Sequence, residues 1–393
     1  MAGQTVARRV ERIPVRADVF RWARVSAGYS LEAAARRAGV KSERLRDWES
    51  SADALLTGVQ VEKFADIYKR PVSALFLLEP PVEPPLPVDF RRHPSSEPEL
   101  LSPASILAIR RARYLQSRYE EDLLGPEDSM FERIPEAGRT GSEQLAERIR
   151  QLLGIPVTEQ RAWGDPGKAL RSWRRSVEGV GVLVFQFSSP VSELRGFSLP
   201  GRVPVIVLNS KDVAQARVFT LFHELSHLLI RSPGMCRPSL EATDAGERTE
   251  VYCNAFAGRL LVPSKDLLAS EVAASLRSGA LNPESAAERL ATGFSVSRIV
   301  GLRALLDHGL IRSAVYRQVV SDWEERAKRG AAKKKSKGGP TPARKALSEL
   351  GSTFVAHVLH ARERSRISDG DVSDFLGVKL RHLPKIEGLL AAE

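Results

Sequence analysis

The residues best suited to chemistry stand together in the segment His223-Glu224-Leu225-Ser226-His227. Residues four apart share one face of an α-helix, so the two histidines can present ring nitrogens to a single metal ion. Glu224 lies about 100° further round the helix, where its carboxylate can reach a metal-bound water without ligating the metal. This is the HExxH arrangement, which predicts His223 and His227 as ligands of Zn2+ and Glu224 as a general base.

Apolar residues flank this motif on both sides, which indicates a buried helix. Burying histidines and a carboxylate without partners would be costly. The alternative to a metal site is a hydrogen-bonded pair within the core of an amphipathic helix. The zinc site is favoured because this motif should arise by chance in only roughly one in a hundred chains of this composition, and because such a polar face is unusual on a helix with apolar flanks.

A catalytic zinc site has three protein ligands and one open position, so the third ligand must come from a separate element. The helix predicted over residues 247–261 offers Glu247 and Glu250. Glu250 is favoured because Asn254 follows one turn later and can orient a ligating histidine or carboxylate. Glu247 is the second candidate. The alternative for both is a solvated helix N-terminus, where the helix dipole favours acidic residues.

Four segments extend this pattern with a definite order and spacing: residues 194–198, 205–209, 219–227 and 250–257. Together they resemble the ImmA/IrrE family of zinc metallopeptidases over roughly residues 140–310. The resemblance implies a zincin-like (gluzincin-type) endopeptidase with Zn2+ bound by His223, His227 and Glu250, and with Glu224 as the base. It also implies a helix-turn-helix repressor as the protein substrate. One departure is Cys253, where the family usually has alanine.

The elements that position these residues indicate an α+β fold that is mostly helical. Strands are predicted over residues 180–185 and 203–208, where β-branched residues cluster between turn residues. The second strand could hold an extended substrate by strand addition, because Pro204 suits an edge strand. The alternative is a central strand with no free edge. Three side chains of this domain are candidate oxyanion donors, although a structural role is expected for each: Tyr252, Arg259 and His308.

Residues 30–49 predict a helix, a glycine turn and a second helix. Ser30 and Ser42 are the expected N-caps, and Gly39 permits the tight turn. The segment resembles the Xre/Cro-type helix-turn-helix, whose second helix typically ends in Trp-Glu. The resemblance implies that this recognition helix can enter a major groove. The alternative is a helical protein-docking or regulatory domain. The candidate DNA-contacting residues are Lys41, Ser42, Arg44 and Arg46.

Composition shifts divide the chain into five predicted regions. Residues 1–80 form the helix-turn-helix domain, and residues 81–140 form a Pro-rich connector and a basic helix. Residues 141–327 form the peptidase-like domain with a small sheet. Residues 328–345 are dense in Lys, Gly and Pro and predict a disordered basic linker. Residues 346–393 predict a small C-terminal helical unit.

The 393 residues carry a formal net charge of +11, which favours acidic partners such as nucleic acid. Residues 1–48 hold 11 Lys or Arg against 5 Asp or Glu, so much of the surplus lies in the first module. The apolar run at 180–192 is shorter than the ~18–20 residues that cross a bilayer, and residues 1–16 lack a secretory apolar core. Two cysteines, at 236 and 253, fit a reducing cytoplasm.

Two functions are consistent with these features. The first is a cytoplasmic zinc endopeptidase that cleaves a repressor-type regulatory protein, and thereby controls prophage, mobile-element, toxin–antitoxin or stress-response genes. The second is a DNA-binding transcriptional regulator or antitoxin-like protein whose zinc site is structural or inactive. DNA is a candidate partner through the N-terminal domain, and no membrane partner is expected.

Overall fold

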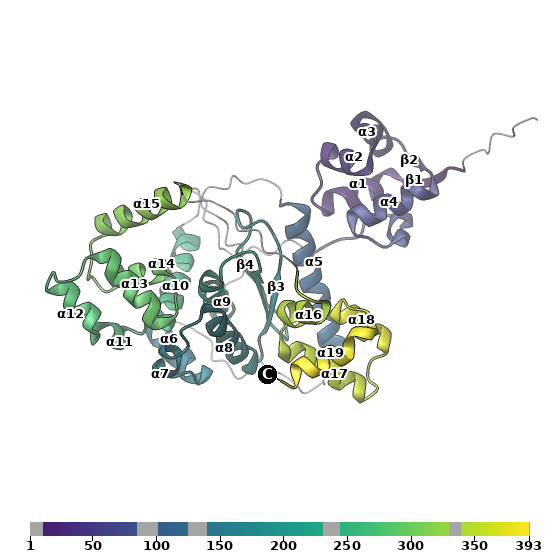
Figure 1. The fold of residues 1–393 in the computed structure, drawn as a ribbon. Coiled ribbons are helices and arrows are strands. Elements are labelled where there is room, and N and C mark those ends of the chain that lie inside the picture. Colours follow the sequence, from purple (N-terminus) through teal and green to yellow (C-terminus); the bar gives the residue numbers. More distant parts are fainter. Residues whose placement is uncertain (1–10, 85–100, 125–139, 231–243, 330–338, 393) are drawn as a thin grey trace, which may run out of the picture. The chain divides into compact units, whose positions relative to one another are not determined.

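The expected mostly helical α+β fold is confirmed by the computed structural model, which describes residues 11–84, 101–124, 140–230, 244–329 and 339–392. The chain forms two units. Unit 1 comprises residues 1–86 and 97–111, and unit 2 comprises residues 87–96 and 112–393 (Figure 1). Helix α5, Pro103–Arg118, passes from one unit into the other.

Unit 1 is a small helical domain with one two-stranded antiparallel sheet. The strands pair Ile13 with Leu56 and Arg16 with Asp53. Both are only four residues long and were not predicted from the sequence. The elements in chain order are β1 Ile13–Arg16, α1 Ala17–Ser26, α2 Leu31–Ala38, α3 Ser42–Ser50, β2 Asp53–Leu56, α4 Gly58–Tyr68 and the 3-10 helix η1 Val72–Phe76.

Helices α2 and α3 occupy the segment predicted as a helix-turn-helix. The Ser30 hydroxyl accepts a hydrogen bond from the Ala33 amide at 3.1 Å, as expected of an N-cap, and Gly39 has φ +68° at the turn. The predicted cap at Ser42 is wrong. Helix α3 begins at Ser42 itself, and Lys41 occupies the cap position without a side-chain hydrogen bond.

The core of unit 1 is aromatic. The rings of Phe20 and Phe64 meet edge to face at 4.9 Å between centroids, and Trp48 and Tyr68 pack around them. Trp48 is therefore held on the buried side of α3, and this leaves the opposite side of the helix to solvent.

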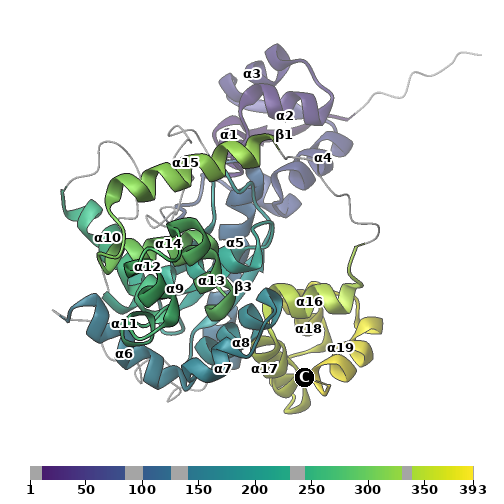
Figure 2. The ribbon, with the colours of Figure 1, turned by 60° about the vertical axis from the view of Figure 1, so that its left-hand side comes forward.

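Unit 2 surrounds a three-stranded sheet with helices on both faces (Figures 1 and 2). Before and within the sheet region lie the π-helix η2 Tyr119–Leu123, α6 Ser142–Leu153, α7 Val157–Arg161, α8 Pro166–Gly179, β3 Leu183–Phe187, β4 Gly196–Leu199 and β5 Val205–Asn209. After it lie α9 Ala214–Ile230, α10 Asp244–Leu261, α11 Ser264–Leu268, α12 Glu271–Arg277, α13 Pro283–Phe294, α14 Arg298–Asp307 and α15 Ser313–Arg329.

The strand order is β3-β5-β4, with β5 parallel to β3 and antiparallel to β4. The strand predicted over residues 203–208 is thus the central strand, and the edge-strand alternative is wrong. Pro204 lies one residue before β5, where its lack of an amide hydrogen costs no ladder bond, and its carbonyl accepts from the Leu183 amide at 2.9 Å. Strand β4, which had not been predicted as a strand, is an edge of the sheet.

Every residue of the three strands is buried, which explains their nearly continuous apolar sequences. One face packs against α8 and α9, and Ile206 and Leu208 belong to that core. On the other face, Phe185 meets Phe354 of the C-terminal helices edge to face, with 5.2 Å between ring centroids.

The C-terminal helices are α16 Pro342–Leu350, α17 Ser352–Glu363, α18 Asp369–Leu376 and α19 Leu383–Leu390, with the 3-10 turn η4 Leu380–His382 before the last. They gather beside β3 and α8 (Figure 2). Helix α15 continues to Arg329 and α16 begins at Pro342, so both ends of the segment predicted as a disordered linker, 328–345, are helical. The Lys-rich residues 330–338 lie outside the described residues, as do 85–100 and 125–139 of the predicted connector.

Candidate metal centre

Helix α9 places the HExxH segment at the middle of unit 2. The helix packs against α8, α10, β4 and β5, so it is buried on nearly all sides from Val218 to Leu229. His223 and Glu224 are fully buried, and His227 is 3% exposed. A helix enclosed in this way would ordinarily carry apolar residues only. The buried polar residues therefore need partners, and α10 and β4 provide them.

Helix α10 brings Glu250 to the two histidines. The Nε2 atoms of His223 and His227 lie 3.2 Å apart. A carboxylate oxygen of Glu250 lies 3.5 Å from His223 Nε2, and its other oxygen lies 3.6 Å from His227 Nε2. The Glu250 side chain is 16% exposed, so this side of the group faces towards solvent.

These separations are compatible with a zinc ion. Zinc bonds of about 2.0–2.1 Å in a tetrahedron place neighbouring ligand atoms about 3.3–3.4 Å apart. The two histidine nitrogens are 3.2 Å apart, and each lies 3.5 or 3.6 Å from a different oxygen of the Glu250 carboxylate. With one ligand atom taken from each residue, the three atoms lie within 4.8 Å of one another. Two imidazoles and one carboxylate also form the donor set of catalytic zinc sites that keep one position open. The residues present therefore fit the metal that the sequence predicts.

The other ring nitrogens of the histidines are held by consecutive residues of α10. Asn254 Oδ1 lies 3.2 Å from His223 Nδ1, and Cys253 Sγ lies 3.6 Å from His227 Nδ1. The Asn254 amide oxygen can only accept, so it favours the proton at His223 Nδ1 and leaves the Nε2 lone pair of that ring towards the metal position. The sequence analysis expected Asn254 to orient either a ligating histidine or the carboxylate, and the structure shows its contact with His223. The contact of Cys253 was not foreseen, because only the packing of α10 on α9 reveals it.

A residue of the sheet holds the Glu224 carboxylate by a hydrogen bond. The Ser198 hydroxyl of β4 donates to Glu224 Oε2 at 3.1 Å, and both residues are buried. The sequence analysis did not single out Ser198 as functional, although it ends the segment 194–198 that carries part of the family resemblance. The signal that could have identified it is a serine in an otherwise apolar strand.

The other sequence candidates lie elsewhere. The side chain of Glu247 is outside the described residues. The Tyr252 hydroxyl donates to the Thr140 carbonyl at 2.8 Å, and burial raises its pKa. Arg259 donates to the Ser142 hydroxyl. His308 bonds the Ala304 carbonyl and the Ser264 hydroxyl at 2.8 and 2.7 Å. These bonds give each of the three oxyanion candidates a structural role.

In unit 1, the candidate DNA-contacting residues lie at the start of α3 and on two sides of it, since Arg44 and Arg46 are about 200° apart around the helix. Lys41, Arg44 and Arg46 are exposed, and Ser42 is half-buried. The Arg44 guanidinium lies over the Trp48 ring at 4.9 Å from its centroid. The structure thus places the basic side chains of this helix where a polyanion could reach them.

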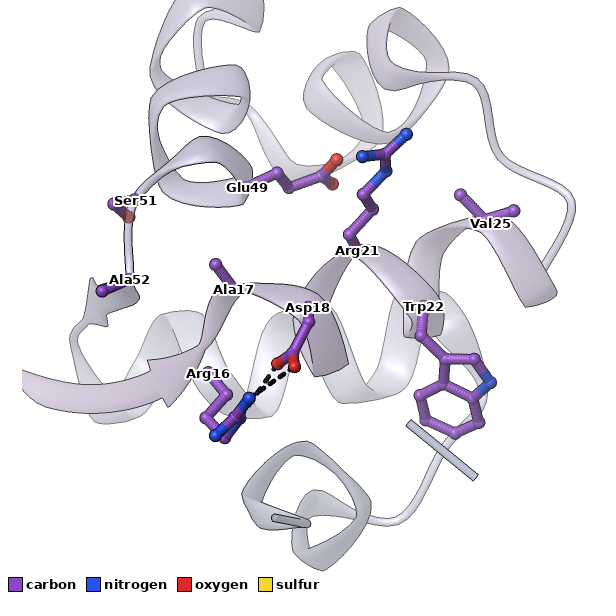
Figure 3. A pocket seen from close by; sticks show the side chains of 9 residues that line it. All are labelled: Arg16, Ala17, Asp18, Arg21, Trp22, Val25, Glu49, Ser51 and Ala52. Carbon is purple, nitrogen blue, oxygen red and sulfur yellow. Dashed lines mark hydrogen bonds and ion pairs between the residues drawn. The ribbon is translucent and has the colours of Figure 1, made fainter. Parts of the chain in front are cut away.

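A hollow of about 610 Å³ also lies in unit 1, between α1 and the end of α3 (Figure 3). Three of its charged side chains are paired within the domain, and the fourth, Arg21, is exposed. Arg16 and Asp18 pair at 2.6 Å, and Glu49 accepts two bonds from Arg24 at 2.7 and 2.8 Å. The hollow holds no histidine or cysteine, so it is not a rival metal centre.

These features together are those of a metallopeptidase-like centre. A small sheet packs on a helix that carries two buried histidines and a buried glutamate, and the next helix supplies Glu250 as a candidate third ligand. Residues 177–305, about a third of the chain, match the model of a peptidase family described as IrrE N-terminal-like domain. The match includes all of the candidate site and supports the ImmA/IrrE resemblance and a zinc-dependent protease. No curated protein matches the chain. Among the described residues, no helix is both long and apolar enough to cross a membrane.

Proposed function

We propose that this protein is a zinc-dependent endopeptidase of the gluzincin type that acts in the cytoplasm on a repressor-type regulatory protein. The observation that carries the proposal is the group of His223, His227 and Glu250 at separations suited to tetrahedral zinc, beside the buried carboxylate of Glu224. The family match over residues 177–305 supports the same activity.

The chemistry follows from the placement of each group. A bound zinc ion would supply a Lewis acid that lowers the pKa of its water towards ~7. Glu224, next to His223 on α9, accepts a proton at its carboxylate and delivers it to the leaving amine of the peptide. Asn254 favours the His223 tautomer that ligation needs, and Cys253 contacts the other ring nitrogen of His227. Ser198 holds one oxygen of the Glu224 carboxylate.

Substrate would pair with β4 and not with β5, whose pairing with a substrate was one of two alternatives that the sequence left open. Strand β5 is central, whereas β4 is an edge strand that packs directly on α9. An extended segment added to this edge would run alongside the metal group. Because residues 196–199 are all buried, the edge must be uncovered before a substrate can pair there.

The test combines metal analysis with proteolysis. We expect the purified full chain to contain about one zinc ion per molecule and to cleave a helix-turn-helix repressor encoded beside its own gene. Glu224→Gln, which keeps the size of the side chain but not its basicity, should retain zinc and lose cleavage. A wild-type protein that binds no zinc, or equal cleavage by both proteins, would refute the proposal.

A second function is favoured by the exposed basic side of α3. Lys41, Arg44 and Arg46 would give the first domain affinity for DNA, so the protein could be a transcriptional regulator whose zinc site is structural or inactive. Gel shifts on DNA from its own locus, with wild type and Arg44→Ala/Arg46→Ala, test this function. Absence of a specific shift by the wild type contradicts it.

A further inference from the structure

We propose that Ser198 is a positioning residue for Glu224, which ties the carboxylate on α9 to the sheet edge where a substrate would pair. The inference rests on the proposed peptidase function and assigns a role to a residue outside the HExxH segment. Its basis is the contact between β4 and α9, together with the hydrogen-bond pattern of β4.

The side-chain contact is enclosed and specific. The Ser198 hydroxyl donates to Glu224 Oε2 at 3.1 Å, with Ser198 2% exposed and Glu224 fully buried. A hydrogen bond to a buried carboxylate holds its orientation more firmly than one in water would, because no solvent competes for the oxygen. Ser198 therefore restricts the rotation of the carboxylate.

Gly196 shows how closely β4 approaches α9. It lies two residues before Ser198, so both point to the same face of the sheet. A Cβ atom on Gly196 would come within 2.4 Å of a Thr220 methyl and 3.7 Å of Glu224 Cγ. Because glycine has no Cβ atom, β4 can pack closely against α9 at this position. This close packing brings the Ser198 hydroxyl within hydrogen-bonding distance of Glu224.

The backbone amide and carbonyl of Ser198 lie in the plane of the sheet and point towards its outer edge, on the side away from β5. The Asn209 amide donates to the Arg195 carbonyl at 2.9 Å, so this opposed pair is hydrogen-bonded. Hydrogen-bonded and non-hydrogen-bonded pairs alternate along an antiparallel ladder, so the next hydrogen-bonded pairs of β4 are those of residues 197 and 199. The amide and carbonyl of Ser198 consequently point away from β5, where an added peptide strand would bond them.

Ser198 thus contacts Glu224 and would also meet a substrate paired with β4. Its backbone would hold the substrate strand, and its side chain orients the group that moves the proton. Removing the hydroxyl leaves the backbone bonds intact, so substrate binding should be nearly unchanged while the proton-transfer geometry is lost. A misplacement on the order of 1 Å costs about 100-fold in rate.

The test uses the zinc-loaded full chain with acetohydroxamic acid as a probe, because a hydroxamate that ligates a metal gives its proton to the neighbouring carboxylate. Ser198→Ala removes the donor, and Ser198→Thr keeps the hydroxyl. Ser226→Ala is the matched control, since Ser226 is a buried serine of α9 whose hydroxyl has no hydrogen-bond partner among the described residues. Melting temperature and zinc content are measured for each.

We expect Ser198→Ala to retain zinc and to bind acetohydroxamate about tenfold more weakly, with Ser198→Thr recovering most of the affinity and Ser226→Ala equal to wild type. On a cleaved repressor, kcat of Ser198→Ala should fall about 10- to 100-fold with KM within about twofold. Equal affinity of Ser198→Ala and wild type, or equal losses in the alanine and threonine variants, would overturn the positioning role. A wild type that binds zinc but not the probe would instead refute the proposed function.

Discussion

Removal of the Glu250 carboxylate should cost the protein most of its zinc affinity. Glu250 is one of the three protein ligands that we propose, with oxygens 3.5 and 3.6 Å from the two histidine nitrogens. Structural zinc sites bind with about 10–16 kcal/mol over four ligands, or roughly 2.5–4 kcal/mol for each. At about 1.4 kcal/mol per tenfold, Glu250→Ala should weaken zinc binding roughly 10²- to 10³-fold.

The assay is competition for zinc with a chromogenic chelator at fixed pH, together with the melting temperature of the metal-free protein. Glu247→Ala is the control, because Glu247 stands one turn earlier on α10 and was the other candidate ligand. We expect Glu247→Ala to bind zinc as the wild type does, and both variants to melt alike without metal. The geometric reasoning is refuted if Glu247→Ala loses zinc and Glu250→Ala keeps it.

Three further predictions concern neighbouring parts of unit 2. Asn254→Ala should weaken zinc binding about 10- to 100-fold in the same competition assay, because it frees the His223 ring. Arg174→Ala should lower the free energy of unfolding by about 3–5 kcal/mol in denaturant titrations, because it leaves buried Glu178 without the bond that Arg174 donates at 2.8 Å. Bonds from Ser368, and the charge of Arg118, lower the pKa of Asp371, so its contribution to stability should be lost as pH falls through that lowered pKa. Melting curves between pH 3 and 6 of wild type and Asp371→Asn should then converge at the acid end.

The parts of the site that could be predicted are those that depend on short sequence distances. The i, i+4 spacing of His223 and His227 requires only that their segment be helical, and the same holds for Glu250 and Asn254. The pairing of the two helices was expected because a zinc site needs a third ligand. These predictions hold even where the predicted ends of the helices differ from the observed ends by a few residues.

The parts that could not be predicted depend on which distant segments meet. Strand β4 is four residues long and contains a glycine and a serine, so its composition is weak evidence for a strand. Pro204 favoured an edge position for the following strand, but the pairing of β5 with β3 on one side and β4 on the other makes it central. The roles of Ser198 and Cys253 follow from those tertiary contacts alone.

The C-terminal helices determine which edge of the sheet can serve the metal group. Strand β3 forms the other edge, but α16 packs against it, and the Gln186 side chain of β3 donates to the Ser348 carbonyl at 2.9 Å. Arg217, two turns before His223 on α9, donates to the same Gln186. The C-terminal helices therefore pack on β3 and are connected through Gln186 to the first half of α9. Among the described residues, β5 is central and α16 packs against β3, so we expect a substrate to pair with β4, the strand that also holds Glu224, once its buried edge is uncovered.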